Sequence, residues 1–180
     1  YTYSWYDELK EKASALALIE NGAKLVSGHA DSMGVPAACK EKNVPNVFYN
    51  GTTSEDTFVI ASKINWQPYF EIMIDGALGK GAIPKDYTGT LSTGSVQITA
   101  LGNAAAPGTQ AKLDEVKAKL VSGEINVFDA AAFTVEGAAL DSYMADVDTD
   151  EAYTPDTEVI TDGYFHESEY RSAPYFDLRI

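Results

Sequence analysis

Hydrophobic and polar positions follow two different periods along the first half of the chain. Apolar residues recur every three to four positions from Asp7 to Asn21, which predicts an amphipathic helix that Gly22 ends. Ser32 can cap a second helix that runs to Lys42. A third helix is predicted over 66–79, and short apolar runs between the helices predict strands. These runs lie at residues 1–5, 23–28, 46–50 and 57–64.

Strands that alternate with helices of this length predict an α/β fold, with a parallel sheet covered by helices on both faces. Beyond Lys80 we expect one or two strands within 89–100, a helix over 110–122 and a strand over 125–128. No period is sustained after residue 135. We therefore expect a lobe over 1–135 and an extension over 136–180. The extension contains aromatic residues, and we therefore expect it to pack on the lobe. They are Tyr164, Phe165, Tyr175 and Phe176.

Composition narrows the class of protein. The chain has 180 residues, of which 45% are hydrophobic, so it can bury a core without cross-links. It contains no run of about 18 apolar residues. Lys and Arg number 13 against 27 Asp and Glu, and most of the acidic excess lies in 136–180. A net charge of −14 argues against a nucleic-acid partner, because binding to phosphates needs basic patches.

Candidate binding residues follow the predicted strands. In an open parallel sheet, ligands bind outside the carboxyl ends of the strands. Trp5, His29, Asp31, Asn50 and Lys63 occupy such positions. An aromatic plate, oxygen acceptors and a cation suit a flat polar ligand with hydroxyl groups, which they bind by stacking and hydrogen bonds.

The sequence offers little for catalysis, and we predict neither an enzyme nor a bound cofactor. Cys39 lies inside a predicted helix, which is typical of an inert buried thiol, and as the single cysteine it excludes an internal disulfide. The glycines around Lys80 lack the spacing of a phosphate-binding loop and fall at a helix end. His166, among aromatic residues, is expected to be a packed side chain.

No metal site is predicted either. Asp146, Asp148 and Asp150 alternate as the first ligands of a calcium loop do, but Glu151 replaces the glycine of that loop and Thr157 its closing glutamate. We interpret this stretch as a solvated acidic loop.

Several motifs, in order along the chain, resemble one family. They are Ser4-Trp-Tyr-Asp7, Gly28-His-Ala-Asp-Ser-Met-Gly-Val35, Ala61-Ser-Lys-Ile-Asn-Trp-Gln-Pro-Tyr-Phe70, Asp75-Gly76 and Lys119-Leu-Val-Ser-Gly-Glu-Ile-Asn-Val-Phe128. Together they resemble the basic membrane protein (PnrA-like) family, the substrate-binding lipoproteins of bacterial ABC importers. The resemblance covers about residues 1–130.

This resemblance implies a Rossmann-like lobe of a type I periplasmic-binding protein, and a chain that is the C-terminal portion of a longer protein. The helix over 66–79 would cross to the other lobe. Known members of the family bind purine nucleosides. The resemblance implies that Trp5 stacks on the base, that Asp31 and Asn50 hydrogen-bond to ribose or base, and that Lys63 adds a charged donor. It adds Trp66 to the expected contacts, while Asn50 stands where the family often has Asp.

The resemblance also implies permease subunits as partners and an extracytoplasmic place, with a lipid anchor through an N-terminal segment outside this chain. The alternative is a sensory or regulatory ligand-binding domain of the same fold, whose closure signals to a partner. From the residues themselves, the helix over 66–79 carries more apolar side chains than one sheet can cover, so we expect self-association.

Overall fold

The computed structural model describes residues 3–53, 56–147, 151–152 and 154–170. The chain divides into two compact units, and each is described by itself. The first unit comprises Tyr1–Ile83 and Leu91–Asp114, and the second comprises Pro84–Thr90 and Glu115–Ile180. The boundary that the sequence suggests at residue 135 stays a prediction. None of the helices in the described part of the chain has the length and apolar character needed to cross a bilayer.

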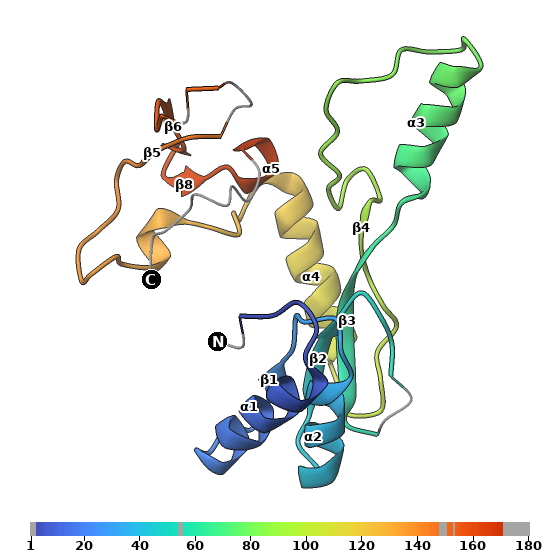
Figure 1. The fold of residues 1–180 in the computed structure, drawn as a ribbon, viewed down its shortest axis with the longest axis vertical. Coiled ribbons are helices and arrows are strands. Elements are labelled where there is room, and N and C mark those ends of the chain that lie inside the picture. The colour runs from blue at the N-terminus through green and yellow to red at the C-terminus, as the bar shows by residue number, and fades with distance from the viewer. Residues whose placement is uncertain (1–2, 54–55, 148–150, 153, 171–180) are drawn as a thin grey trace. The chain divides into compact units, whose positions relative to one another are not determined.

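The first unit is built on a four-stranded sheet with the order β1-β2-β3-β4. β1, β2 and β3 are parallel, whereas β4 runs antiparallel to β3 (Figure 1). The strands are β1 (Val26–Ser27), β2 (Asn46–Tyr49), β3 (Phe58–Ile64) and β4 (Val96–Ile98). The helices of this unit are α1 (Glu8–Glu20), α2 (Gly34–Lys42) and α3 (Gln67–Ala77), and α4 (Thr109–Ser122) begins in it. The predicted α/β class, with a mainly parallel sheet flanked by helices, is confirmed.

Helices α1 and α2 begin and end where the local sequence predicts. The Asp7 carboxylate accepts a hydrogen bond from the Lys10 backbone N–H at 3.0 Å, which caps α1. Gly22 follows the helix with φ +98°, a left-handed conformation that glycine adopts without strain. At α2, the Ser32 hydroxyl accepts from the Gly34 N–H at 3.1 Å, although Met33 occupies the cap position.

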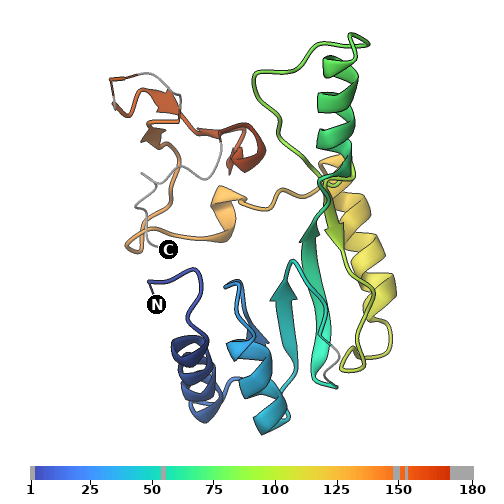
Figure 2. The same ribbon diagram turned by 45° about the vertical axis from the view of Figure 1, so that its right-hand side comes forward.

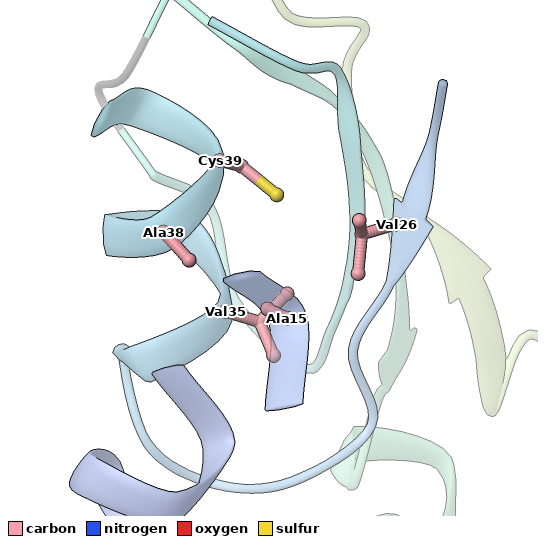
Figure 3. Close-up of a cluster of buried hydrophobic side chains, with 5 residues drawn as sticks. All are labelled: Ala15, Val26, Val35, Ala38 and Cys39. Atoms are coloured by element: carbon pink, nitrogen blue, oxygen red, sulfur yellow. The ribbon is translucent and has the colours of Figure 1, made fainter. Parts of the chain in front are cut away.

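The core of the first unit lies where α1 and α2 pack on each other and on β1 (Figure 3). Its buried side chains are Ala15, Val26, Val35, Ala38 and Cys39. Small residues let the two helices approach closely, and Gly34 of α2 lies against the backbone of α1. A Cβ atom at Gly34 would lie 2.4 Å from the Glu8 carbonyl oxygen. A second cluster, of Phe48, Phe58 and Ala61, lies between β2 and β3.

Helix α3 extends away from this core, beyond the end of the β3–β4 pair (Figures 1 and 2). The sequence placed this helix over 66–79, and the structure confirms it with Pro68 in the first turn. All of its residues are described, and none of them is buried. The chain returns from α3 to β4, which pairs Ile64 with Val96 and Ser62 with Ile98.

The second unit consists of short elements held together by hydrogen bonds and by a few buried apolar side chains. The latter are Ala130, Ala145, Val159 and Ile160. After α4 it contains η1 (Ala130–Ala132), the β5–β6 pair (Met144–Ala145 with Thr157–Glu158), the β7–β8 hairpin (Ile160–Thr161 with Tyr164–Phe165) and α5 (Glu167–Tyr170). The Glu158 carboxylate accepts hydrogen bonds from the Ser142 hydroxyl and from the Tyr143 and Ile160 N–H groups. These hydrogen bonds lower the pKa of the Glu158 carboxyl group, and the bond from the Ser142 hydroxyl contributes most. Phe165 packs on Phe128, with ring centroids 5.8 Å apart, while Tyr175 and Phe176 lie outside the described residues.

Four predicted strands are wrong in whole or in part. Residues 3–5 form no strand, because Ser4 folds back to bond with the Tyr6 backbone; residues 1–2 are not described. Residues 125–128 form a bend and a turn instead of a strand. Of 89–100 only Val96–Ile98 is a strand, and its antiparallel direction departs from the fully parallel sheet. The strand expected at 23–28 is shortened to Val26–Ser27.

Candidate functional site

The candidate site is the edge of the first unit's sheet where β1, β2 and β3 end. Because the three strands are parallel, their carboxyl ends share this edge. Ser27 pairs with Val47, so the residues after β1 run beside the last residues of β2. Tyr49 pairs with Ser62, so Asn50 comes beside Lys63 in the last step of the ladder before β3 ends. All six side chains expected to bind a ligand are exposed. They are Trp5, His29, Asp31, Asn50, Lys63 and Trp66.

Trp5 and Asp31 are joined through the backbone. The Asp31 N–H donates to the Trp5 carbonyl oxygen at 3.0 Å, which holds the segment before α1 against the loop after β1. The Trp5 side chain is 85% exposed, so its ring is open to a planar ligand. Trp5 is therefore placed at this edge although the strand predicted before it is wrong.

His29 lies two residues after β1. Its Nε2 atom is 3.1 Å from the Ser27 hydroxyl, and its ring centroid lies 6.3 Å from that of Tyr49 at the end of β2. Sequence reasoning missed Tyr49 as a neighbour of His29. The period of two along a strand is the signal that could have identified Tyr49, because it puts Tyr49 on the same face as Val47. In the structure Asn46 and Phe48 are buried, while Val47 and Tyr49 are partly exposed.

Asn50 and Lys63 are held together by the β2–β3 ladder. The Asn50 N–H donates to the Ser62 carbonyl at 2.6 Å, and the Asn50 Oδ1 accepts from the Ile64 N–H at 3.2 Å. These two bonds bracket Lys63. Asn50 has φ +55°, a left-handed conformation that asparagine tolerates better than most residues. Its amide group is thus fixed by β3 at the end of β2, beside the root of Lys63.

The motif that contains His29 and Asp31 separates into two kinds of residue. Ser32, Gly34 and Val35 are buried, and each has a packing role. Ser32 donates its hydroxyl to the buried Glu11 carboxylate, Gly34 allows the close contact with α1, and Val35 lies in the core. Folding explains these three residues. It does not explain the exposed His29 and Asp31, which remain available for binding.

Trp66 occupies the cap position of α3 and differs from the other five residues. Its ring centroid is 6.4 Å from that of Tyr69 and 6.2 Å from that of Phe70, so it belongs to the aromatic group of α3. Its role as a ligand contact stays a prediction.

The cysteine and the glycines considered for catalysis have structural roles. Cys39 is buried in the core, and burial raises the pKa of its thiol, which disfavours the nucleophilic thiolate. Gly79 follows the end of α3, where the glycines stop a helix and do not open one. No group of three or more His, Cys, Asp or Glu side chains able to hold a metal occurs in the described ranges. Asp148 and Asp150 lie outside these ranges.

Comparison with known proteins bears on the fold. No protein-family model matches the chain, and no curated protein matches it. Among solved structures, the chain is similar to an ABC transporter solute-binding protein from Conexibacter woesei, with a TM-score of 0.57 and 22% sequence identity. The match covers 71% of this chain and 44% of that protein, so the chain spans less than half the length of its structural relative. The narrower resemblance to the basic membrane protein family stays a prediction. The chain has the fold of part of a solute-binding protein.

Proposed function

We propose that the chain is a ligand-binding lobe of the substrate-binding component of a bacterial ABC importer. The observation that carries this proposal is the shared edge of β1, β2 and β3, at which His29, Asn50 and Lys63 are exposed and the Trp5 segment is held against the loop after β1. The similarity to a solute-binding protein supports the same role. In such a component, two lobes close on the ligand by a hinge motion and no bond chemistry follows.

We further propose that the ligand is a purine nucleoside or a similar small polar molecule. Trp5 offers an open aromatic ring for a base. Asp31 offers a carboxylate for the paired hydroxyls of a sugar, and Lys63 offers a charged donor. The Asn50 amide, fixed by the Ile64 N–H, can add a directed hydrogen bond. The protein would act outside the cytoplasm, lipid-anchored in its full-length form, and deliver its ligand to permease subunits.

Calorimetry on the full-length protein, with adenosine, guanosine and inosine as ligands, tests this proposal. Trp5→Ala is expected to weaken binding by about 1–3 kcal/mol, the contribution of one base–aromatic stack. Leu18→Ala is the matched control, because Leu18 is an exposed apolar residue near the other end of α1. Nucleoside binding that is absent, or equal in the Trp5→Ala variant, would contradict the proposed ligand.

A further inference from the structure

Glu11, in the first turn of α1, is a charged side chain that the fold buries. It is 3% exposed, whereas Glu8 in the same turn lies in solvent. Helix α2 covers it, because a Cβ atom added at Gly34 would lie 3.0 Å from the Glu11 Cβ. Removing a carboxylate from water costs free energy unless hydrogen bonds replace the water. The burial of Glu11 is therefore explained by the groups that it binds.

The two oxygens of this carboxylate bind two different segments of the chain. Oε1 accepts a hydrogen bond from the Asp7 N–H at 2.8 Å, at the start of α1. Oε2 accepts from the Ser32 hydroxyl, in the loop between β1 and α2. The Ser32 oxygen in turn accepts from the Gly34 N–H at 3.1 Å, and its single proton is directed at Glu11. Both partners lie at the N-terminal ends of helices, where the partial positive charge stabilises a carboxylate.

The two segments that Glu11 joins carry two of the candidate ligand contacts. Trp5 lies two residues before Asp7, and Asp31 directly precedes Ser32. The Asp31 N–H also donates to the Trp5 carbonyl oxygen at 3.0 Å. The segments are thus joined twice, once between two exposed residues and once through the buried carboxylate. A single neutral hydrogen bond contributes little net stability, so the buried link with its charged acceptor does most to fix their separation.

We propose that Glu11 is a positioning residue of the ligand site, which holds the backbone of Trp5 and of Asp31 at a fixed separation before a ligand arrives. This inference rests on the function proposed above. Groups that are held in place before binding lose less freedom when the ligand binds, and binding is stronger for that reason. A ligand that contacts both residues, as a nucleoside would through its base and its sugar, gains most from a fixed separation.

Glu11→Gln is the sharpest variant, because glutamine has the same shape but only one acceptor oxygen. If that oxygen binds the Asp7 N–H, the amide group faces the Ser32 hydroxyl, whose proton loses its acceptor. If it binds the Ser32 hydroxyl instead, the amide group faces the Asp7 N–H, and two donors meet. One of the two links is lost in either case. Glu8→Gln is the matched control, because it removes the same charge from the same helical turn at an exposed position.

Hydrogen–deuterium exchange without ligand tests the link itself. In the full-length protein, Glu11→Gln is expected to speed exchange of the Asp31 amide by about tenfold, the factor to which one lost hydrogen bond with a charged group corresponds. The Val44 amide, which bonds to the backbone of α2 in the same unit, should keep its rate. Ser32→Ala removes the other end of the link and should have the same effect, and it replaces Glu11→Gln if circular dichroism shows that variant to be unfolded. An Asp31 amide that exchanges no faster than in Glu8→Gln would overturn the proposal.

Calorimetry with adenosine, guanosine and inosine tests whether the link serves binding. Glu11→Gln is expected to weaken binding roughly three- to tenfold, and Glu8→Gln by less than about twofold. In a Trp5→Ala background the effect of Glu11→Gln should shrink to less than about twofold, because one of the two positioned residues is gone. In a Lys63→Ala background the effect should persist. A merely structural role would weaken binding equally in both backgrounds.

The two measurements separate this proposal from the proposed function. Equal effects in the Trp5→Ala and Lys63→Ala backgrounds, or faster exchange with no loss of affinity, would rule out a positioning role. An absence of nucleoside binding by the unmodified protein would contradict the proposed ligand instead, and the exchange rates would then decide whether Glu11 holds the two segments together.

Discussion

The two ends of the first unit use apolar side chains in opposite ways. Around β1, the side chains of Ala15, Val26 and Cys39 are at most 4% exposed, although they are small. Along α3, the much larger Trp66 and Phe70 are more than half exposed. The density of apolar residues in a sequence therefore does not locate a core. Two helices and a strand that approach closely make one, and a lone helix does not.

Gly34→Ala should have the largest effect on this comparison, because it attacks the close approach of α1 and α2. The added Cβ would stand 2.4 Å from the Glu8 carbonyl oxygen and 2.8 Å from the Lys12 nitrogen. Both are backbone atoms, so the helices must separate. We expect a loss of about 1–3 kcal/mol in the free energy of unfolding, measured by urea denaturation.

Gly81→Ala, in the segment after α3, is the matched control for this change. A Cβ at Gly81 would have no atom within 4 Å. Its unfolding free energy should stay within about 0.5 kcal/mol of that of the unmodified chain. Equal losses in the two glycine variants would mean that the contact between α1 and α2 is no more tightly packed than the segment after α3.

The second unit extends the comparison to a region of short elements, in which hydrogen bonds of one histidine join two segments. His166 lies between Glu169, whose carboxylate is 2.9 Å from Nδ1, and Thr161, whose hydroxyl is 2.9 Å from Nε2. The hydrogen bond with Glu169, assisted by the Thr161 backbone and the charge of Asp162, raises the pKa of His166 above its ordinary 6.5. The protonated ring therefore stabilises the folded unit. This stabilisation is complete below about pH 6.5 and is lost as the pH rises through the raised pKa of the folded state.

Thermal unfolding as a function of pH measures this contribution. The difference in Tm between the unmodified chain and His166→Gln should be largest below pH 6.5 and should shrink at higher pH. NMR of the imidazole protons should give a pKa above that of a free histidine. A Tm difference that grows with pH would have the wrong sign for this account.

Ile74→Ala should have the smallest effect of all on the monomer. Ile74 is 57% exposed, and alanine favours the helix, so the unfolding free energy should change by less than about 0.5 kcal/mol. Val26→Ala in the core should cost on the order of 2 kcal/mol by comparison. Both are measured by urea denaturation. A large loss for Ile74→Ala under these conditions would show that α3 is packed within the monomer.

The contrast between the core around β1 and helix α3 also explains which elements could be predicted from the sequence. α1 could be predicted in full, because Asp7 and Gly22 act locally and the apolar spacing lies within the helix itself. The direction of β4 could not, because it depends on the pairing of Ile64 with Val96, far apart along the chain. The apolar run 125–128 had the composition of a strand. It forms none because a strand needs a partner, and the chain turns at Val127 and Phe128.

For the candidate site, the sequence predicts residues near the strand ends. His29 and Asn50 do follow β1 and β2. Lys63 instead lies within β3, and Trp5 follows no strand. The sequence could not predict what fixes these residues in place. The bond from the Ile64 N–H to Asn50 and the bond from the Asp31 N–H to Trp5 both arise from the folded backbone. Ligand contact by these side chains remains a prediction until binding is measured.

The root of α3 has a mechanical consequence. A helix that leaves a sheet on one strand can swivel about a few backbone dihedrals. Here the outgoing β3 and the returning β4 pair from Ser62–Ile98 to Ile64–Val96. The helix therefore begins on a two-stranded ribbon, which is stiffer than a single strand. Lys63 belongs to the same ribbon and faces Gln97 in the ladder. A torque applied to α3 would therefore twist the ribbon and turn Lys63 with it, which makes the helix a lever on the edge of the sheet.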